Sequence, residues 1–220
     1  MSTVAILPVK SFGAAKQRLA PTLAGGSRQA LAQAMLSDVL DSLGRIAGLD
    51  GVVVVTADHE AGSEARDAEA HVLKDTEQAG QSPAANLGIR HALDRGFERV
   101  LLVPGDTPLL APGEVDALLE RAETERLGVV VVPDRHGEGT NALLLTPPDA
   151  IEPSFGPGSL QRHVEAATAA RVAHSVVRVP TLMLDIDTGD DLNELIRVLE
   201  DSNGSAPATR DALRRAALAA

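Results

Sequence analysis

The 220-residue chain contains no cysteine, tryptophan or tyrosine, and only three phenylalanines. Without thiols it can form no disulfide, thiolate nucleophile, cysteine-type zinc site or iron–sulfur cluster, so any metal site must use oxygen or imidazole ligands. The shortage of aromatic side chains removes the stacking platforms that bind single-stranded nucleic acid. A net charge of −11 also opposes binding to a phosphate backbone. We therefore expect no nucleic-acid partner.

Long apolar runs are missing as well. No run approaches the roughly 18 residues of a membrane span, and the first ten residues lack the basic and apolar segments of a secretion signal. We therefore expect a cytoplasmic protein with no membrane partner. The length suits one domain over residues 1–201, followed by a tail over 202–220. For this tail the weak apolar stripe leaves a short helix and a mobile segment both open.

Apolar runs of strand length alternate with amphipathic stretches of helix length. This alternation is typical of βαβ units and predicts an α/β fold with a mostly parallel sheet. Four consecutive valines, 52–55, suit a strand that is covered on both faces. The predicted strands are Thr3–Pro8, Gly51–Ala57, His71–Lys74, Arg99–Pro104, Val129–Pro133, Asn141–Thr146 and Ala173–Val179.

Helices are predicted between these strands from apolar spacing and from capping residues. The first covers Ser27–Leu43 with Ser27 as its N-cap, and the next two cover Ser82–Arg95 and Pro112–Glu125. Near the C-terminus, Thr188 and Asp191 have the spacing of an acidic capping box, which predicts a helix that continues through Leu199.

Three aspartates have the placement of metal ligands. Asp106 follows a strand of buried type, and Asp185 and Asp187 are two residues apart, so in an extended chain their side chains point to the same side. Two carboxylates so placed repel each other, and a divalent cation would relieve the repulsion. Because Mg²⁺ prefers hard oxygen ligands, the three aspartates predict a magnesium site. The alternatives are a turn stabilised by Asp106 and a helix start served by Asp187.

A basic loop, with Lys10, Lys16 and Arg18, follows the first strand. Ligands of open α/β sheets bind at the carboxyl ends of strands, so this loop is placed to hold phosphates, although a solvated surface loop is the alternative. The chain has neither a P-loop motif nor a G-x-G-x-x-G after the first strand. P-loop hydrolases and Rossmann dehydrogenases are therefore disfavoured.

A second loop is built from glycine and proline and leads into a helix. Gly156 and Gly158 precede Ser159, and the free N–H groups of a helix start can bind an anion. The alternative is a plain loop in which Ser159 caps the helix. The six histidines form no i, i+4 pair, which disfavours a zinc hydrolase.

Taken together, these motifs resemble those of the guanylyltransferases of coenzyme F(420) biosynthesis, which use 2-phospho-L-lactate or phosphoenolpyruvate. The resemblance covers residues 5–195, and five stretches carry it: Pro8–Ala20, Pro104–Leu110, Gly139–Leu145, Phe155–His163 and Asp185–Thr188. It implies the nucleotide-diphospho-sugar transferase fold, a three-layer α/β/α sandwich with a twisted, mostly parallel mixed sheet. It also implies the transfer of GMP from GTP to a phosphorylated three-carbon acid, with Mg²⁺ as the cofactor.

The resemblance assigns roles to individual residues. It implies metal binding by Asp106, Asp185 and Asp187, and binding of the acid's phosphate by Thr140, Gly156 and Ser159. It implies GTP binding by Pro8, Lys10, Lys16, Arg18 and Asn86, with Lys16, Arg18 and Asp106 as the catalytic residues. The chain departs from the family pattern at Gln17, at Gly189 and at Ala84-Ala85-Asn86. The last departure leaves the selection of guanine open.

The implied reaction needs no catalytic histidine, because a phosphate monoester with a second pKa of about 6 is already a dianion at neutral pH. Lys16 and Arg18 would stabilise the leaving pyrophosphate. A composition rich in alanine and arginine and poor in lysine resembles that of actinobacterial proteins, which favours phosphoenolpyruvate over 2-phospholactate. The alternatives are a molybdopterin-type nucleotidyltransferase and a non-catalytic GTP-binding protein. The sequence also allows a homodimer.

Overall fold

The computed structural model describes residues 1–14, 16–201 and 204–218. It contains a seven-stranded sheet with the order β3-β2-β1-β4-β6-β5-β7. Strand β6 pairs antiparallel with β4 and β5, and the other pairings are parallel. The strands are β1 (Thr3–Val9), β2 (Gly51–Thr56), β3 (His71–Lys74), β4 (Arg99–Leu102), β5 (Val129–Pro133), β6 (Thr140–Leu145) and β7 (His174–Val176).

Each predicted strand is present, and the differences lie at the strand ends. The largest is in β7, which ends at Val176 rather than at Val179. The pairing with β5 extends to the bond from the Val177 N–H to the Val131 carbonyl (3.0 Å), and the chain then leads into a short 3-10 helix, η3 (Pro180–Leu182).

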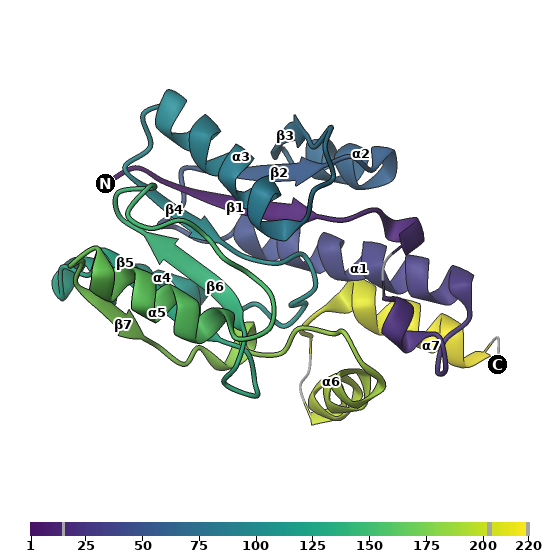
Figure 1. Cartoon of the computed structure of the whole chain (residues 1–220). Coiled ribbons are helices and arrows are strands. Elements are labelled where there is room, and N and C mark those ends of the chain that lie inside the picture. Colours follow the sequence, from purple (N-terminus) through teal and green to yellow (C-terminus); the bar gives the residue numbers. More distant parts are fainter. Residues whose placement is uncertain (15, 202–203, 219–220) are drawn as a thin grey trace.

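Helices cover both faces of the sheet (Figure 1). On one face lie α1 (Gly25–Leu43), α2 (His59–Asp67) and α4 (Pro112–Thr124), and on the other lie α3 (Gln81–Asp94) and α5 (Ser159–Ala169). The alternation along β1 follows from the pleat, since Ala5 and Leu7 belong to the first core and Val4 and Ile6 to the second. The predicted three-layer α/β/α sandwich is confirmed.

A third apolar cluster joins the two C-terminal helices to α1. Helices α6 (Gly189–Asp201) and α7 (Pro207–Leu218) contribute Leu192, Leu195 and Leu213, which pack with Leu31 and Met35 of α1. Figure 1 shows α7, in yellow, lying along α1. The region predicted as a tail thus holds a packed helix, while residues 202, 203, 219 and 220 lie outside the described part of the chain.

The start of α7 is capped from another helix. Asp38 of α1 accepts hydrogen bonds from the N–H groups of Ala208 (3.0 Å) and Thr209 (2.8 Å). A carboxylate in this position satisfies free donors and interacts favourably with the positive end of the helix dipole. The tail sequence carries no sign of this cap, because the capping residue is 170 positions away.

Local capping signals succeeded at one helix and failed at two others. Thr188 and Asp191 form the predicted capping box, in which the Thr188 N–H donates to Asp191 (2.8 Å) and the Asp191 N–H donates to the Thr188 hydroxyl (3.3 Å). Ser27 as the N-cap of α1 was wrong, because helical hydrogen bonding already begins with the bond from the Arg28 N–H to the Ala24 carbonyl. Helix α2, capped by Asp58, was not predicted.

Among the described residues, no helix combines the length and apolar content that crossing a membrane requires.

Candidate active site

The candidate site lies where β1 and β4 end. These strands are parallel neighbours, so the loops that follow them start at the same edge of the sheet. The antiparallel strand β6 begins at this edge, because it pairs with β4 in the opposite direction. The chain order reverses between β1 and β4, which is where ligands bind in open α/β sheets. The sheet therefore brings the basic loop, Asp106 and the start of β6 together.

The two aspartate motifs are joined through the backbone. The carbonyl group of Asp106 accepts a hydrogen bond from the N–H of Ile186, which lies between Asp185 and Asp187 (3.2 Å). This bond holds the two motifs side by side, although they are far apart in the sequence. The structure thus brings together the three aspartates that the sequence singled out.

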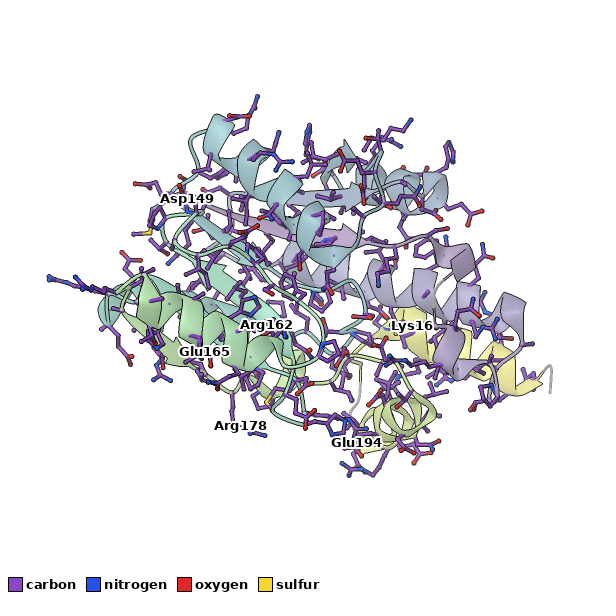
Figure 2. The ribbon with its side chains drawn as sticks, viewed as in Figure 1. Lys16, Asp149, Arg162, Glu165, Arg178 and Glu194 are labelled. Atoms are coloured by element: carbon purple, nitrogen blue, oxygen red, sulfur yellow. The ribbon has the colours of Figure 1, made fainter. Side chains whose placement is uncertain are left out.

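Lys16 places its ammonium group among these carboxylates. It donates to Asp106 and, over 3.1 Å, to Asp187, and its side chain is only 8% exposed. Burial by itself lowers the pKa of Lys16, but the charges of Asp106 and Asp187 outweigh it and raise the pKa above its ordinary value. Lys16 therefore stays a cation. Figure 2 labels it beside the segment that precedes α6.

Asp185 is held in place by Asn141 of β6. The Asn141 amide donates to Asp185 (3.1 Å) and to the carbonyl of Leu182 (3.0 Å), which fixes the amide group in place. Burial, followed by the charge of Asp106, raises the pKa of Asp185 to about 6. Asp185 therefore lies in a site with an excess of negative charge. The motif that contains Asn141 was recognised, but the residue was not assigned a role.

The donor set fits a magnesium ion. Mg²⁺ takes carboxylate oxygens, and Oδ1 of Asp106 is buried without a hydrogen-bond partner in the described chain. A cation would satisfy that oxygen and reduce the repulsion at Asp185. In the arrangement observed, no three acidic or histidine side chains of the described residues are grouped to coordinate one ion. The Lys16 ammonium lies between Asp106 and Asp187 instead.

Asp191 and Arg135 support the turn that carries Asp187. Oδ2 of Asp191 accepts from the N–H groups of Asp187 (3.2 Å) and Thr188 (2.8 Å), and Oδ1 accepts from the Arg135 guanidinium (2.6 and 2.7 Å). Burial alone would raise the pKa of Asp191, but the hydrogen bonds from Thr188 and Arg135 lower it. The sequence predicted Asp191 only as a helix cap. Its pairing with Arg135, 56 positions away, had no local signal.

The basic loop is anchored by Asp58 at the start of α2. Asp58 accepts from the Ser11 hydroxyl (2.9 Å) and the Phe12 N–H (3.1 Å). Of the predicted cations, Lys16 alone lies at the aspartates. Lys10 and Arg18 are exposed and form no ion pair with another described residue, so both are free to meet a ligand.

The other two predicted nucleotide contacts lie outside the carboxylate cluster. Pro8 is near the end of β1, opposite Val55 of β2. Asn86 lies on α3, and its amide donates over 3.4 Å to Glu152, in the segment between β6 and α5. This places Asn86 beside the loop that carries Gly156.

The residues predicted for the acid's phosphate form a second group. Thr140 begins β6 and Ser159 begins α5, and the Ser159 N–H donates to the Gly156 carbonyl (3.0 Å). His163 joins the group through a 3.0 Å hydrogen bond between Nδ1 and the Thr140 hydroxyl oxygen. The Ser159 hydroxyl is buried and has no partner among the described residues. The N-cap of α5 is Gly158, which decides against Ser159 as a capping residue.

The requirement for glycine at position 156 is conformational. A Cβ atom there would meet open space, so approach of a neighbouring group is not the constraint. The backbone φ of 105° is the constraint, because residues with a side chain rarely adopt it.

A surface hollow of the described chain lies away from these residues. It has a volume of about 1090 Å³ and lies between α1 and α2, lined by residues such as Gln33, Glu60 and Glu64. It is wide open and contains none of the motif residues, and its acidic side chains would repel a nucleotide. We therefore locate the site by the converging charged groups rather than by volume.

Comparison with known proteins shows the family of the chain. A family model described as "Guanylyl transferase CofC like" matches residues 3–218. A phosphoenolpyruvate guanylyltransferase of Conexibacter woesei is 49% identical over 215 residues, which cover 98% of this chain and 96% of that protein. A 2-phospho-L-lactate guanylyltransferase of Methanothermobacter thermautotrophicus is 37% identical, with 89% of this chain and 85% of that protein covered.

Solved structures show the same fold. A protein of Desulfovibrio desulfuricans G20, described as a nucleotide-diphospho-sugar transferase, superposes with a TM-score of 0.78 at 20% identity. The superposition covers 98% of this chain and 95% of that one. At this identity the likeness concerns the fold, which is the one that the sequence motifs implied.

Proposed function

The chain belongs to the CofC-like guanylyltransferase family, and from this premise we propose that it joins the GMP part of GTP to the phosphate of phosphoenolpyruvate. Pyrophosphate is the second product, and the reaction is a step of coenzyme F(420) biosynthesis. The observation that carries the proposal is the convergence of Lys16 with Asp106 and Asp187, and of Asp185 beside them, at the edge where β1 and β4 end.

The proposed reaction is one phosphoryl substitution. An oxygen of the acid's phosphate forms a bond to the α-phosphorus of GTP, and the bond from that phosphorus to the bridging oxygen of the β-phosphate breaks. The bonding electrons leave with pyrophosphate. A phosphate dianion is already a nucleophile at neutral pH, so no general base is needed. This agrees with a carboxylate cluster that includes no histidine.

The protein's task is to bring several negative charges together in the right positions. Asp106, Asp185 and Asp187 would hold Mg²⁺, which when bound neutralises charge on the phosphates. Lys16 supplies a buried cation whose raised pKa keeps it charged. Lys10 and Arg18, exposed on the same loop, would contact the polyphosphate. Positioning and electrostatic stabilisation of this kind account for most of phosphoryl-transfer catalysis.

The relatives support phosphoenolpyruvate as the acid. The relatives named as phosphoenolpyruvate guanylyltransferases include one at 49% and one at 42% identity, whereas the 2-phospho-L-lactate enzyme cited above is at 37%. The two acids differ in whether the central carbon is planar, and pocket shape separates such analogues by only about 10- to 200-fold. We expect a preference rather than exclusion. The use of GTP also supports the expected cytoplasmic location.

The test is pyrophosphate release from GTP and Mg²⁺ with phosphoenolpyruvate, 2-phospholactate or 3-phosphoglycerate. We expect the highest kcat/KM with phosphoenolpyruvate, no release without an acid, and loss of release with EDTA. Replacing GTP by CTP tests the base and separates this proposal from a cytidylyltransferase. A more than tenfold advantage for 2-phospholactate, about 1.4 kcal/mol, would change the acid and keep the reaction. No release with any acid would leave a GTP-binding protein as the alternative.

A further inference from the structure

Arg162 organises the loop between β6 and α5. Its guanidinium donates to the carbonyl groups of Ser154 (2.8 Å), Phe155 (3.2 Å), Gly156 (3.5 Å) and Pro157, and to the Ser154 hydroxyl (2.9 Å). Successive carbonyl groups of this loop are therefore turned toward one cation. The N–H groups of Gly156 and Gly158 have no acceptor in the described chain. Donors of this kind are available to an anion.

His163, the next residue of α5, connects the same loop to β6. Its side chain is fully buried, and its Nε2 accepts a hydrogen bond from the Ser154 N–H (2.8 Å). A nitrogen that accepts carries no proton, so the single proton of the neutral ring is on Nδ1. That proton is donated to the Thr140 hydroxyl oxygen over 3.0 Å.

The opposite assignment of the ring proton is excluded by the geometry. A proton on Nε2 would face the Ser154 N–H across 2.8 Å, so that two donors would meet. A charged ring carries a proton on both nitrogens, so its Nε2 proton would also face the Ser154 N–H. Burial, followed by the charge of Arg162, lowers the pKa of His163 to about 4, which agrees with a neutral ring. The Thr140 hydroxyl is thus an acceptor toward His163, and its own hydrogen has no partner in the described chain.

We propose that Arg162 and His163 are positioning residues for the acid substrate: they set the Gly156 and Gly158 N–H groups and the Thr140 hydroxyl hydrogen as donors for its phosphate. This inference rests on the proposed function. It explains why three segments, the start of β6, the loop and α5, are held together at this point. It adds Arg162 and His163 to a pocket for which the sequence predicted only Thr140, Gly156 and Ser159.

The alternative is that both residues only stabilise the fold. A structural role predicts a loss of stability with normal Michaelis constants, or equal changes for both substrates. A positioning role predicts that the KM for the acid changes alone, because the donors contact the acid's phosphate and no part of GTP. The split between the two Michaelis constants therefore separates the two roles.

The first test replaces His163. His163→Phe keeps a ring against Phe155 but removes both hydrogen bonds, whereas His163→Gln offers one acceptor and one donor in their place. We expect the KM for phosphoenolpyruvate to rise about tenfold or more in His163→Phe, because bonds to a charged group are worth more than neutral ones, with little change in the KM for GTP. In His163→Gln most of the affinity should return. Glu165→Gln, on the exposed side of α5, is the matched control (Figure 2).

The second test replaces Arg162, labelled in Figure 2 on the same helix. Arg162→Met keeps the stem and removes every bond to the loop carbonyls, and Arg162→Lys keeps the charge but lacks the planar fork that reaches several oxygens. We expect the acid's KM to rise in both variants, more in Arg162→Met. If His163→Phe and Arg162→Met do not fold, as judged by circular dichroism, Arg162→Lys decides alone.

Two results would overturn the proposal. One is an acid KM within twofold of the wild type in folded Arg162 and His163 variants. The other is an equal rise in the Michaelis constants for acid and GTP. These results leave the proposed function intact, since the wild-type chain still turns over its acid. A wild-type chain without pyrophosphate release for any acid would instead overturn the proposed function and this inference together.

Discussion

Two neighbouring groups of residues at the edge of the sheet work by different physical means. The carboxylate cluster, Asp106, Asp185 and Asp187 with Lys16, depends on charge. Lys16 forms ion pairs with Asp106 and Asp187, whose charges raise its pKa against the effect of burial, and burial and the charge of Asp106 raise the pKa of Asp185. The loop group, Thr140, Ser154–Ser159, Arg162 and His163, depends on backbone conformation and on hydrogen bonds, those of the neutral His163 ring and those that the Arg162 guanidinium donates to the loop. The groups meet at successive residues of β6, since Thr140 binds His163 and Asn141 binds Asp185.

This difference predicts which kinetic constant changes when each group is altered. Neutralising a carboxylate leaves its shape but removes the charge that the first group needs, so turnover should fall. In the second group the proposed contacts to the acid's phosphate are N–H and O–H donors, so their directions matter. A substitution that turns these donors away should lower the affinity for the acid. The predictions below test this contrast, from the largest effect to the smallest.

The largest effect is expected for Asp187→Asn. This change keeps the shape of the side chain, which is half exposed, and removes one unit of charge from the cluster. We expect kcat to fall about 100-fold or more, in line with the loss of a catalytic electrostatic contact, with little change in the melting temperature. Asp190→Asn, the same chemical change at an exposed neighbour, is the control. Near wild-type pyrophosphate release in Asp187→Asn would remove this residue from the site.

Gly156→Val tests the second group through its backbone. Valine is strained at the φ of 105° found here, so the loop must change conformation and the free N–H groups move with it. We expect the KM for the acid to rise about 10- to 100-fold, equivalent to 1–3 kcal/mol of strain or misplacement, and the KM for GTP to stay within a few-fold. Gly96→Asn, in the turn after α3, is the matched control, because it lies outside the loop group and at a φ of 78° asparagine is tolerated. Equal effects of both substitutions would contradict the conformational explanation.

The neutral ring of His163 predicts a dependence of stability on pH. Its pKa is about 4 in the folded protein, against about 6.5 when unfolded, so between these values the unfolded chain binds more protons. The contribution of His163 is therefore complete above pH 6.5 and is lost as the pH falls toward 4. At pH 5 the loss should be about 2 kcal/mol in the free energy of unfolding, measured with urea in the presence of EDTA.

To isolate the contribution of His163, the free energy of unfolding of the wild type is compared with that of His163→Phe at each pH. Asp185 acts in the opposite sense, because its raised pKa of about 6 makes the folded protein gain stability as the pH falls through that value. Its effect cancels when the two proteins are compared at the same pH. A difference that is constant between pH 7 and pH 5 would show that His163 titrates normally.

The smallest effect is expected for Arg135→Met, which acts on the carboxylate cluster indirectly, through Asp191. Asp191 would lose the guanidinium that binds its Oδ1, while its Oδ2 still holds the N–H groups of Asp187 and Thr188. We expect kcat to fall about tenfold, the lower end of the effect of losing a residue that supports a metal ligand, and the acid's KM to stay unchanged. Arg197→Met, which removes an exposed pair on α6, is the control. A change in the acid's KM alone would assign Arg135 to the second group.

Local rules predicted the fold well, because the strands are covered on both faces and read as continuous apolar runs. Val52–Val55 is such a run in β2: Val52 and Val54 pack in the core on one face of the sheet, and Val53 and Val55 pack in the core on the other. The same rules missed α2, whose short sequence has few large apolar residues, and misplaced the start of α1. Where a helix starts depends on the residues that precede it. Here the chain turns after Leu19, and α1 starts at Gly25, two residues before Ser27.

The sequence by itself determined the order of the strands along the chain and the residue types at their ends. It also determined the chemistry available there, which is oxygen ligands and cations without thiols. These features depend on composition and on short-range periodicity, which need no knowledge of distant contacts. Resemblance then assigned Asp106, Asp185, Asp187, Thr140 and Ser159 to two sites.

Only the tertiary structure decided which of these groups meet. Lys16 is 90 positions from Asp106 and 171 from Asp187. The path of the loop that Asp58 anchors brings the ammonium group of Lys16 to these aspartates, rather than the side chain of Lys10 or Arg18. The proton on Nδ1 of His163 likewise depends on the Ser154 N–H that happens to face Nε2. Ion pairs and proton positions depend on distances and directions between segments, and these exist only once the sheet has brought its strand ends to one edge.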